Sequence, residues 1–115
     1  MSVGAVDREV LGLIRRVVLD EARRLGVEVE RVILFGSRAR GDARPDSDWD
    51  ILVVVEGRID RRRKTILAAG VGATLTRLLG SPVDVVVVSG DYWRRYKGLP
   101  GTILYPAAVE GVAIV

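Results

Sequence analysis

The chain contains no cysteine, histidine, asparagine or glutamine among its 115 residues. Without cysteine and histidine it can form no disulfide, and it offers no thiol nucleophile, imidazole base or Cys/His zinc site. Any chemistry must therefore rest on carboxylates, hydroxyls, arginine, lysine, backbone amides and a hard cation. The lack of these thermolabile side chains is also typical of heat-adapted proteins.

Long apolar runs and a strong charge of one sign are missing as well. No run approaches the roughly 20 apolar residues of a membrane span, and Asp7, Arg8 and Glu9 precede any apolar stretch, unlike in a signal peptide. We therefore expect a cytoplasmic protein without a membrane partner. The net charge of +3 permits an anionic ligand, but we do not expect direct nucleic-acid binding from it. With 49% hydrophobic residues, we expect one domain over residues 1–115.

The sequence does contain alternating helix and strand patterns. Apolar residues from Val6 to Leu25 recur at three- and four-residue spacing, which predicts a helix that ends at Gly26. Further helices are predicted over 59–79, 91–97 and 104–109, and strands over 32–35, 50–55, 83–88 and 112–115. This order predicts an α/β (α+β) fold with a small mixed sheet flanked by helices.

The clearest functional signal is a pair of aspartates, Asp48 and Asp50, where the second expected strand begins. Aspartate is depleted in strands, and strand alternation puts both side chains on one face, with Trp49 on the other. At a separation of about 7 Å and an effective dielectric of about 20, two such charges repel by about 2.4 kcal/mol. A divalent cation reverses this repulsion, and Mg²⁺ favours one or two carboxylates plus substrate phosphates. The pair therefore predicts a metal site that a phosphorylated ligand completes.

Gly36 and Ser37 follow the first expected strand and form a candidate phosphate site. Glycine lets the backbone approach a ligand closely, and a helical turn opened by Ser37 would direct its amide and hydroxyl at an anion. Arg38 and Arg40 follow within reach of phosphate oxygens, and Arg40 is the preferred candidate ligand. Two simpler interpretations stay open: Ser37 as a helix N-cap, and Arg40 as an ion-pair partner of Asp42.

Asp84 is an isolated acid in the valine-rich third strand. If this strand lies beside the second, Asp84 joins Asp48 and Asp50 in one cleft. There it would bind a second metal ion or accept a proton from an attacking hydroxyl. Such a carboxylate set is typical of in-line nucleotidyl transfer. We therefore expect Asp48, Asp50 and Asp84 to be both catalytic and metal-binding residues.

Gly36-Ser37, ten intervening residues and Asp48-Trp49-Asp50 resemble the G-S-x10-D-x-D signature of the nucleotidyltransferase superfamily typified by DNA polymerase β. The fuller run GSRARGDARPDSDWDILV is similar to the minimal nucleotidyltransferase (MNT) domains of prokaryotes. These small proteins are often encoded beside a HEPN-domain partner in toxin–antitoxin pairs. The tail LYPAAVEGVAIV is similar to the closing helix and strand of that family.

The resemblance implies a nucleotide bound between the Gly-Ser turn and the acidic strands. By position, Gly36 and Ser37 would hold the triphosphate, Asp48 and Asp50 would bind Mg²⁺ in a two-metal site, and Asp84 would be the third acid. Some members transfer AMP from ATP to a tyrosine of the HEPN toxin. The implied function is therefore a Mg²⁺-dependent protein adenylyltransferase that acts as an antitoxin, with ATP as substrate and a HEPN protein as partner.

Two other functions stay open on the sequence. A chain of this size could neutralise a HEPN ribonuclease by binding alone, or serve as the catalytic subunit of a small-molecule nucleotidyltransferase. Apolar helix faces also fit a homo- or hetero-oligomer. The densest basic cluster is formed by Arg58, Arg61, Arg62, Arg63 and Lys64. Such a cluster is typical of a solvent-exposed face. Cations at a helix start are unfavourable in the field of the helix dipole, however, so a role in binding an anionic partner stays open.

Overall fold

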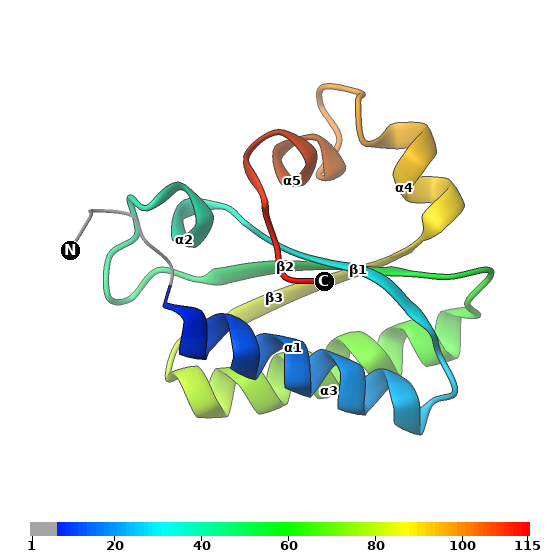
Figure 1. Ribbon diagram of the computed structural model, residues 1–115, viewed down its shortest axis with the longest axis horizontal. Coiled ribbons are helices and arrows are strands. Elements are labelled where there is room, and N and C mark those ends of the chain that lie inside the picture. The colour runs from blue at the N-terminus through cyan, green and yellow to red at the C-terminus, as the bar shows by residue number, and fades with distance from the viewer. Residues whose placement is uncertain (1–6) are drawn as a thin grey trace.

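The computed structural model describes residues 7–115 and has one sheet between two layers of helices (Figure 1). The helices are α1 (Arg8–Arg24), α2 (Ser37–Arg40), α3 (Arg61–Leu79), α4 (Gly90–Tyr96) and α5 (Leu104–Glu110), and the strands are β1 (Val29–Phe35), β2 (Trp49–Val55), β3 (Val83–Ser89) and β4 (Val112–Ala113). This confirms the predicted mixed fold class. No helix within the described range is long and apolar enough to cross a membrane.

The four strands lie in the order β3-β2-β1-β4. β1 runs antiparallel to β2 and to β4, whereas β2 and β3 are parallel. A parallel pair needs a crossover connection, and α3 supplies it. Because β2 lies between β3 and β1, it is an inner strand, and every residue from Ile51 to Val55 is at most 1% exposed. Full burial of each aliphatic side chain there stabilises the fold by about 1.5–3 kcal/mol.

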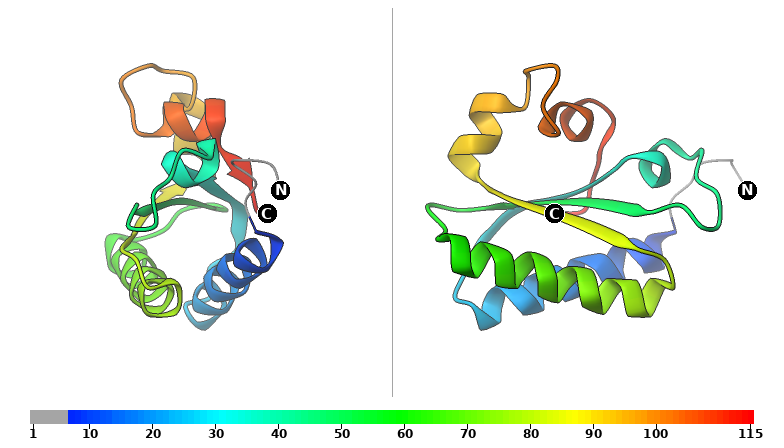
Figure 2. Two further views of the ribbon diagram at one scale, coloured as in Figure 1. Left: turned by 90° about the vertical axis from the view of Figure 1, so that its left-hand side faces the viewer. Right: turned by 180° about the vertical axis from the view of Figure 1, so that it is seen from behind.

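Strand alternation divides the core into two parts, one on each face of the sheet. Ile51 and Val53 face the layer of α1 and α3, where they pack in one apolar cluster. Leu52 and Val54 face the layer of α4 and α5 and pack in a second cluster around Trp93. Figure 2 shows α1 and α3 side by side beneath the sheet, with the shorter helices above it. We call these the α1–α3 face and the α4–α5 face.

Side-chain caps fix the starts of three helices. Asp7 caps α1 by accepting from the amide of Glu9, Asp60 caps α3 through the amide of Arg63, and Ser89 caps α4 through the amide of Tyr92. The predicted end of the first helix is confirmed, because Gly26 follows the C-cap residue Leu25 and adopts a φ of +68°. Val6, from which the apolar spacing was counted, lies outside the described residues.

α3 is continuous although Gly70 and Gly72 lie in its middle. A Cβ atom on Gly72 would lie 3.4 Å from the carbonyl oxygen of Val83, so α3 approaches β3 to within ordinary contact distance at this point. Glycine lowers helix propensity by up to about 1 kcal/mol relative to alanine, and the packing of the helix on the sheet overrides this local preference.

Two strand boundaries differ from the sequence prediction by more than one residue. β1 begins at Val29 rather than Val32, because Glu30 and Arg31 lie in an irregular part of the ladder where charged side chains reach solvent. The last strand is limited to Val112–Ala113, although the amide of Ile114 still donates to the carbonyl oxygen of Val32 at 2.7 Å.

Candidate functional site

The three aspartates predicted from the sequence lie at one end of the sheet. Asp50 in β2 and Asp84 in β3 are direct register partners in the parallel pair. Each precedes by two positions a residue of the α4–α5 cluster, Leu52 and Val86 respectively, so both acids belong to that face. Asp48 precedes β2 by one residue and is exposed. The expected adjacency of the second and third strands is therefore confirmed.

The grouping of the three acids affects the pKa of Asp50 most clearly. Partial burial raises the pKa of its carboxyl above the ordinary value, and the negative charges of Asp84 and then Asp48 raise it further. The positive charge of Arg40 acts in the opposite direction and lowers that pKa. Two carboxylates thus repel that of Asp50 at the start of β2, and one guanidinium is near enough to oppose the repulsion.

This donor set fits a hard divalent cation that is completed by a ligand. Within residues 7–115, no three acidic side chains lie close enough together to hold a metal ion by themselves. Mg²⁺ rarely uses such an all-protein cage, because it keeps waters and binds one or two carboxylates plus substrate phosphates. Asp48 and Asp50 are the residues that would hold it, and a bound cation would relieve the repulsion on Asp50.

Gly36 brings the end of β1 against the same carboxylate. Phe35 is the register partner of Asp50, and Gly36 follows it with a φ of +78° and a ψ of −161°. A Cβ atom at this position would overlap the Oδ2 atom of Asp50. Glycine is therefore required twice, by its positive φ and by the contact with the acid.

Ser37 opens a single helical turn, as predicted. The amides of Ala39 and Arg40 each donate to the carbonyl oxygen of Gly36 at 3.0 Å. Gly36 occupies the N-cap of α2, so the interpretation of Ser37 as the N-cap is wrong. The first amides of a helix have no intrahelical acceptor, and the hydroxyl of Ser37 is not used as the N-cap acceptor of this turn.

The side chain of Arg38 holds the loop between α2 and β2 in place through hydrogen bonds. Its Nη2 atom donates to the carbonyl oxygens of Ser47 at 2.8 Å and Pro45 at 3.1 Å. Its guanidinium carbon lies 4.4 Å from the ring centroid of Trp49. The buried Ser81 hydroxyl adds a longer bond to the carbonyl oxygen of Pro45. Arg38 thus sets the path of the chain into Asp48, a role that residue type alone did not indicate.

Arg40 lies between two acids and near a third. It forms ion pairs with Asp42 at 3.3 Å and with Glu110 of α5 at 2.9 Å, and hydrogen bonding to Glu110 and then Asp42 raises its pKa. The predicted pairing with Asp42 is confirmed. Glu110 was not anticipated, because 70 residues separate it from Arg40 and no local pattern links them.

Comparison with known proteins gives a consistent match. The model of the nucleotidyltransferase domain family matches residues 15–102. A curated relative from Methanocaldococcus jannaschii, named provisionally as a protein adenylyltransferase, is 42% identical over 48 residues. That segment covers 42% of this chain and about half, 48%, of the relative. A solved structure described provisionally as a minimal nucleotidyltransferase is 34% identical with a TM-score of 0.57, covering 92% of this chain and 94% of that one.

Toxin–antitoxin complexes are also similar in structure. One, solved with AMP-PNP, is 25% identical with a TM-score of 0.56, covering 87% of this chain and 71% of that one. Another contains a tri-AMPylated Shewanella oneidensis HEPN toxin and an MNT antitoxin; at 19% identity, a TM-score of 0.50 and coverage of 91% and 71%, it shows a shared fold. Because the family model spans more than half of the sequence and includes the Gly-Ser turn and all three acids, the chain belongs to the nucleotidyltransferase domain family.

Proposed function

We propose that the protein is a Mg²⁺-dependent nucleotidyltransferase that transfers AMP from ATP to a hydroxyl group of a partner protein. The observation that carries this proposal is the alignment of Gly36, Asp50 and Asp84 across three neighbouring strands. Gly36 lies against Asp50, and Asp50 is the register partner of Asp84. A phosphate-binding turn, a metal-binding acid and a further acid are thus in line on one face of the sheet.

The chain's own residues divide the reaction between them. Gly36 and Ser37 would hold the triphosphate, and Asp48 and Asp50 would hold Mg²⁺, which supplies charge neutralisation to the phosphates. The acceptor oxygen forms a bond to the α-phosphorus while the bond from that phosphorus to the β-phosphate oxygen breaks. Pyrophosphate leaves toward the Gly-Ser turn, and the hydroxyl proton passes to Asp84 or to solvent. Asp84 would alternatively share a second metal ion.

Arg40 is the cation best placed to meet the phosphates. Its charge acts on Asp50, and its ion pairs with Asp42 and Glu110 are largely open to solvent. Exposed pairs contribute only about 0–1 kcal/mol, so a phosphate oxygen can replace a carboxylate at the guanidinium at little cost. The restraint from two acids keeps Arg40 at the mouth of the site before the nucleotide arrives.

The proposed acceptor is a tyrosine of a HEPN-domain protein. This part rests on the MNT-like sequence from Gly36 to Val53 and on the nature of similar proteins, which include a provisionally named protein adenylyltransferase and a toxin–antitoxin complex solved with AMP-PNP. Since the chain spans about half of the curated relative, acceptor and partner are inferred from similarity and from the site together.

The test is transfer of labelled AMP. The purified chain is incubated with Mg²⁺, the protein encoded by the adjacent gene as the proposed HEPN-domain partner, and ATP that carries the label on either the α- or the γ-phosphate. We expect α-label, but no γ-label, to become attached to the partner. Replacing Asp48, Asp50 or Asp84 with asparagine should lower the rate by about 100-fold or more, because positioned metal and acid–base groups each contribute on this scale.

Asp46→Asn is the matched control, because Asp46 is an exposed acid of the preceding loop. This variant should retain the wild-type rate. Transfer of the γ-label would indicate phosphoryl transfer instead. Equal rates for Asp50→Asn and Asp46→Asn would refute a catalytic role for the acidic pair.

Neutralisation of a toxin by binding alone is the second candidate. It is favoured by exposed apolar side chains in and around the α4–α5 layer, with Leu99, Ile103 and Val109 52%, 55% and 66% exposed. Gathered apolar surface commonly marks a protein interface. A variant without all three aspartates separates the two functions: if it still inhibits the partner fully, occlusion is sufficient, whereas loss of inhibition requires the chemistry.

A further inference from the structure

A groove follows the outer edge of β3. A cavity of about 380 Å³ is lined by Val86 and Val88, which belong to the α4–α5 face, and by Val87 from the opposite face. A second, more open hollow of about 590 Å³ continues between β3 and α3 and includes Val85. Because residues of both faces line these hollows, together they surround the edge of the strand and do not lie on one face alone.

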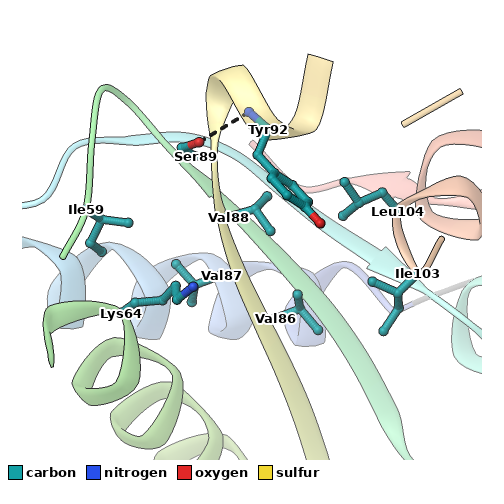
Figure 3. A pocket seen from close by; sticks show the side chains of 9 residues that line it. All are labelled: Ile59, Lys64, Val86, Val87, Val88, Ser89, Tyr92, Ile103 and Leu104. Atoms are coloured by element: carbon teal, nitrogen blue, oxygen red, sulfur yellow. Dashed lines mark hydrogen bonds between the residues drawn. The ribbon is translucent and has the colours of Figure 1, made fainter. Parts of the chain in front are cut away.

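The walls of this β3-edge groove come from three elements (Figure 3). Tyr92 of α4 lies between Val88 and Leu104, and Ile103 faces the strand from the segment before α5. Lys64 of α3 lies on the other side of the strand and is shared by both hollows. Tyr92 and Ile103 are 50% and 55% exposed, so apolar surface remains open to a partner.

The edge itself is suited to main-chain pairing. β3 pairs with β2 on one side and, within residues 7–115, with no strand on the other. Its sequence VDVVVVS contains no proline, lysine or arginine, although proteins usually protect a free edge with such residues. The amide of Val83 at the start of this edge donates to the hydroxyl of Thr76 at 3.2 Å. Beyond it, every second residue directs its N–H and C=O groups toward an incoming strand. Main-chain bonds to such an edge provide affinity, and side-chain pockets beside it provide specificity.

The groove begins where the proposed reaction would need its acceptor. Across the sheet, the order is Gly36, then Asp50, then Asp84, and then the free edge. In an in-line displacement, the attacking group enters opposite the leaving group. If pyrophosphate leaves on the side of Gly36, the acceptor enters on the side of Asp84. Val86, which lines the groove, follows Asp84 by two positions on the same face, so the groove starts one repeat of the strand beyond the third acid.

Charge indicates which segment the groove accepts. α3, which flanks it, contains five cationic residues and no acid in its sequence RRRKTILAAGVGATLTRLL. Among the ion pairs of the described residues, none includes Arg61, Arg62 or Lys64. A second copy paired through the same edge would bring two such helices, both cationic, to one interface. An acidic segment is complementary to them, which favours a different protein as the occupant.

We propose that the free edge of β3 docks an extended, acid-flanked segment of the acceptor protein as an additional strand, with its apolar side chains in the groove. This inference rests on the proposed function for the identity of the partner as the acceptor. It assigns the start of α3, including Arg61, Arg62 and Lys64, a role in recognition rather than in nucleotide binding.

Two matched pairs of variants test the proposal. Lys64→Glu is compared with Arg77→Glu, the same charge change at the other end of α3, and Ile103→Glu with Leu78→Glu, which lies at that same end of α3 and is similarly exposed at 52%. The affinity of each variant for the protein encoded by the adjacent gene, the proposed HEPN-domain partner, and for AMP-PNP with Mg²⁺ is measured by calorimetry. Amide hydrogen exchange over residues 83–89 is followed with and without the partner. The KM values for ATP and partner are measured as well.

We expect Lys64→Glu and Ile103→Glu to weaken partner affinity and raise its KM by about tenfold or more, because interface contacts of this kind are each worth a factor of that order. Both controls should remain within about twofold, and affinity for AMP-PNP should not change, because no groove residue contacts the Gly-Ser turn. The amides of β3 should become protected when the partner binds.

Several results would overturn the proposal. One is a complex in which the amides of β3 stay unprotected from hydrogen exchange. Another is an equal loss of partner affinity in Lys64→Glu and Arg77→Glu, and a third is the absence of any complex. Concentration-dependent protection of β3 in the isolated chain, with the mass of a dimer, would assign the edge to a second copy. If the partner binds and protects β3 but receives no AMP, the proposed function fails while docking at this edge is retained.

Discussion

Gly36 joins backbone conformation to the chemistry of the site. Gly36 and Gly57 both have a positive φ, of +78° and +67° respectively, but the two positions differ in their surroundings. A Cβ atom on Gly57 would meet no atom within 4 Å, whereas one on Gly36 would overlap the carboxylate of Asp50. Gly36 also has a ψ of −161°, outside the left-handed helical region, so both its backbone conformation and the contact with Asp50 disfavour a Cβ atom, whereas at Gly57 no contact does.

We expect Gly57→Ala to lower the free energy of unfolding by about 1–2 kcal/mol, the cost of a left-handed conformation for a residue with a Cβ atom. Gly36→Ala should lose more, since Asp50 must also move. Its affinity for AMP-PNP with Mg²⁺ should fall by about tenfold or more, because a small misplacement of a site costs at least this factor. Urea unfolding and calorimetry measure both quantities. Equal behaviour of the two variants would contradict the contact between Gly36 and Asp50.

The raised pKa of Asp50 predicts a pH-dependent stability. Burial and the charges of Asp84 and Asp48 disfavour the ionised form in the folded state. The folded-state pKa is therefore above the unfolded-state value, so the favourable contribution is present below the unfolded pKa and is lost as the pH rises through the folded pKa. At neutral pH, in the absence of metal, Asp50→Asn should be more stable than the wild type.

This difference should shrink as the pH falls toward the ordinary range of an aspartate, where the wild-type carboxyl becomes neutral as well. Urea unfolding at a series of pH values measures it, with Asp46→Asn as the control for loss of an exposed acid. A wild-type protein that is more stable than Asp50→Asn at neutral pH without metal would show that attraction, not repulsion, dominates at this carboxylate.

The positions of individual candidate site residues could be predicted from the sequence when the signal lay in local spacing. Asp48, Asp50 and Gly36 stand at strand ends, and alternation alone puts the two acids on one face. The binding of Arg38 to the carbonyl oxygens of Ser47 and Pro45 could not be predicted, because it depends on the path of a loop. The pairing of Arg40 with Glu110 depends on packing between distant elements.

At the scale of elements, α3 shows how local chemistry defines a boundary. Asp60 accepts a hydrogen bond from the amide of Arg63 at 3.0 Å and also pairs with its guanidinium. These interactions with Arg63 lower the pKa of the Asp60 carboxyl. A lowered folded-state pKa stabilises the protein above the unfolded pKa, and this stability is lost as the pH falls through the folded value.

Asp60→Ala should therefore unfold at lower urea concentration than the wild type at neutral pH, and the deficit should decrease in acid. Asp60→Asn is the informative companion, because asparagine retains an acceptor for the amide of Arg63 but carries no charge. It should be intermediate at neutral pH and should lose the pH dependence. A pH-independent deficit in Asp60→Ala would mean that the carboxylate charge does not contribute to the cap.

Helices and inner strands were predicted well because their apolar periodicity is strong. The start of β1 was missed because Glu30 and Arg31 interrupt the apolar run, while main-chain pairing with β2 still includes Val29. The length of the last strand was overestimated, since four apolar residues in sequence do not reveal that only Val112 and Ala113 keep a regular register with β1, while the amide of Ile114 still donates to Val32.

At the scale of the whole molecule, charge is separated along the sheet. The carboxylates of Asp48, Asp50 and Asp84 are at the end where β2 and β3 begin, and the cations at the start of α3 follow the end of β2. The sequence alone could not establish the strand order that produces this separation, because residue spacing does not determine which strands lie next to each other. Knowing that β3 is an edge strand required the structure.

The β1–β2 hairpin and the α3 crossover also differ in how they assemble the site. The hairpin brings Gly36 to Asp50 through a contact between residues close in sequence, whereas Asp84 joins only after residues 56–82 have folded back beside β2. Local pairing forms faster than pairing across a long connection. During synthesis on the ribosome, a chain that has emerged only as far as α3 therefore carries the turn and two acids but lacks the third. Translation itself delays completion of the site until the crossover has been made.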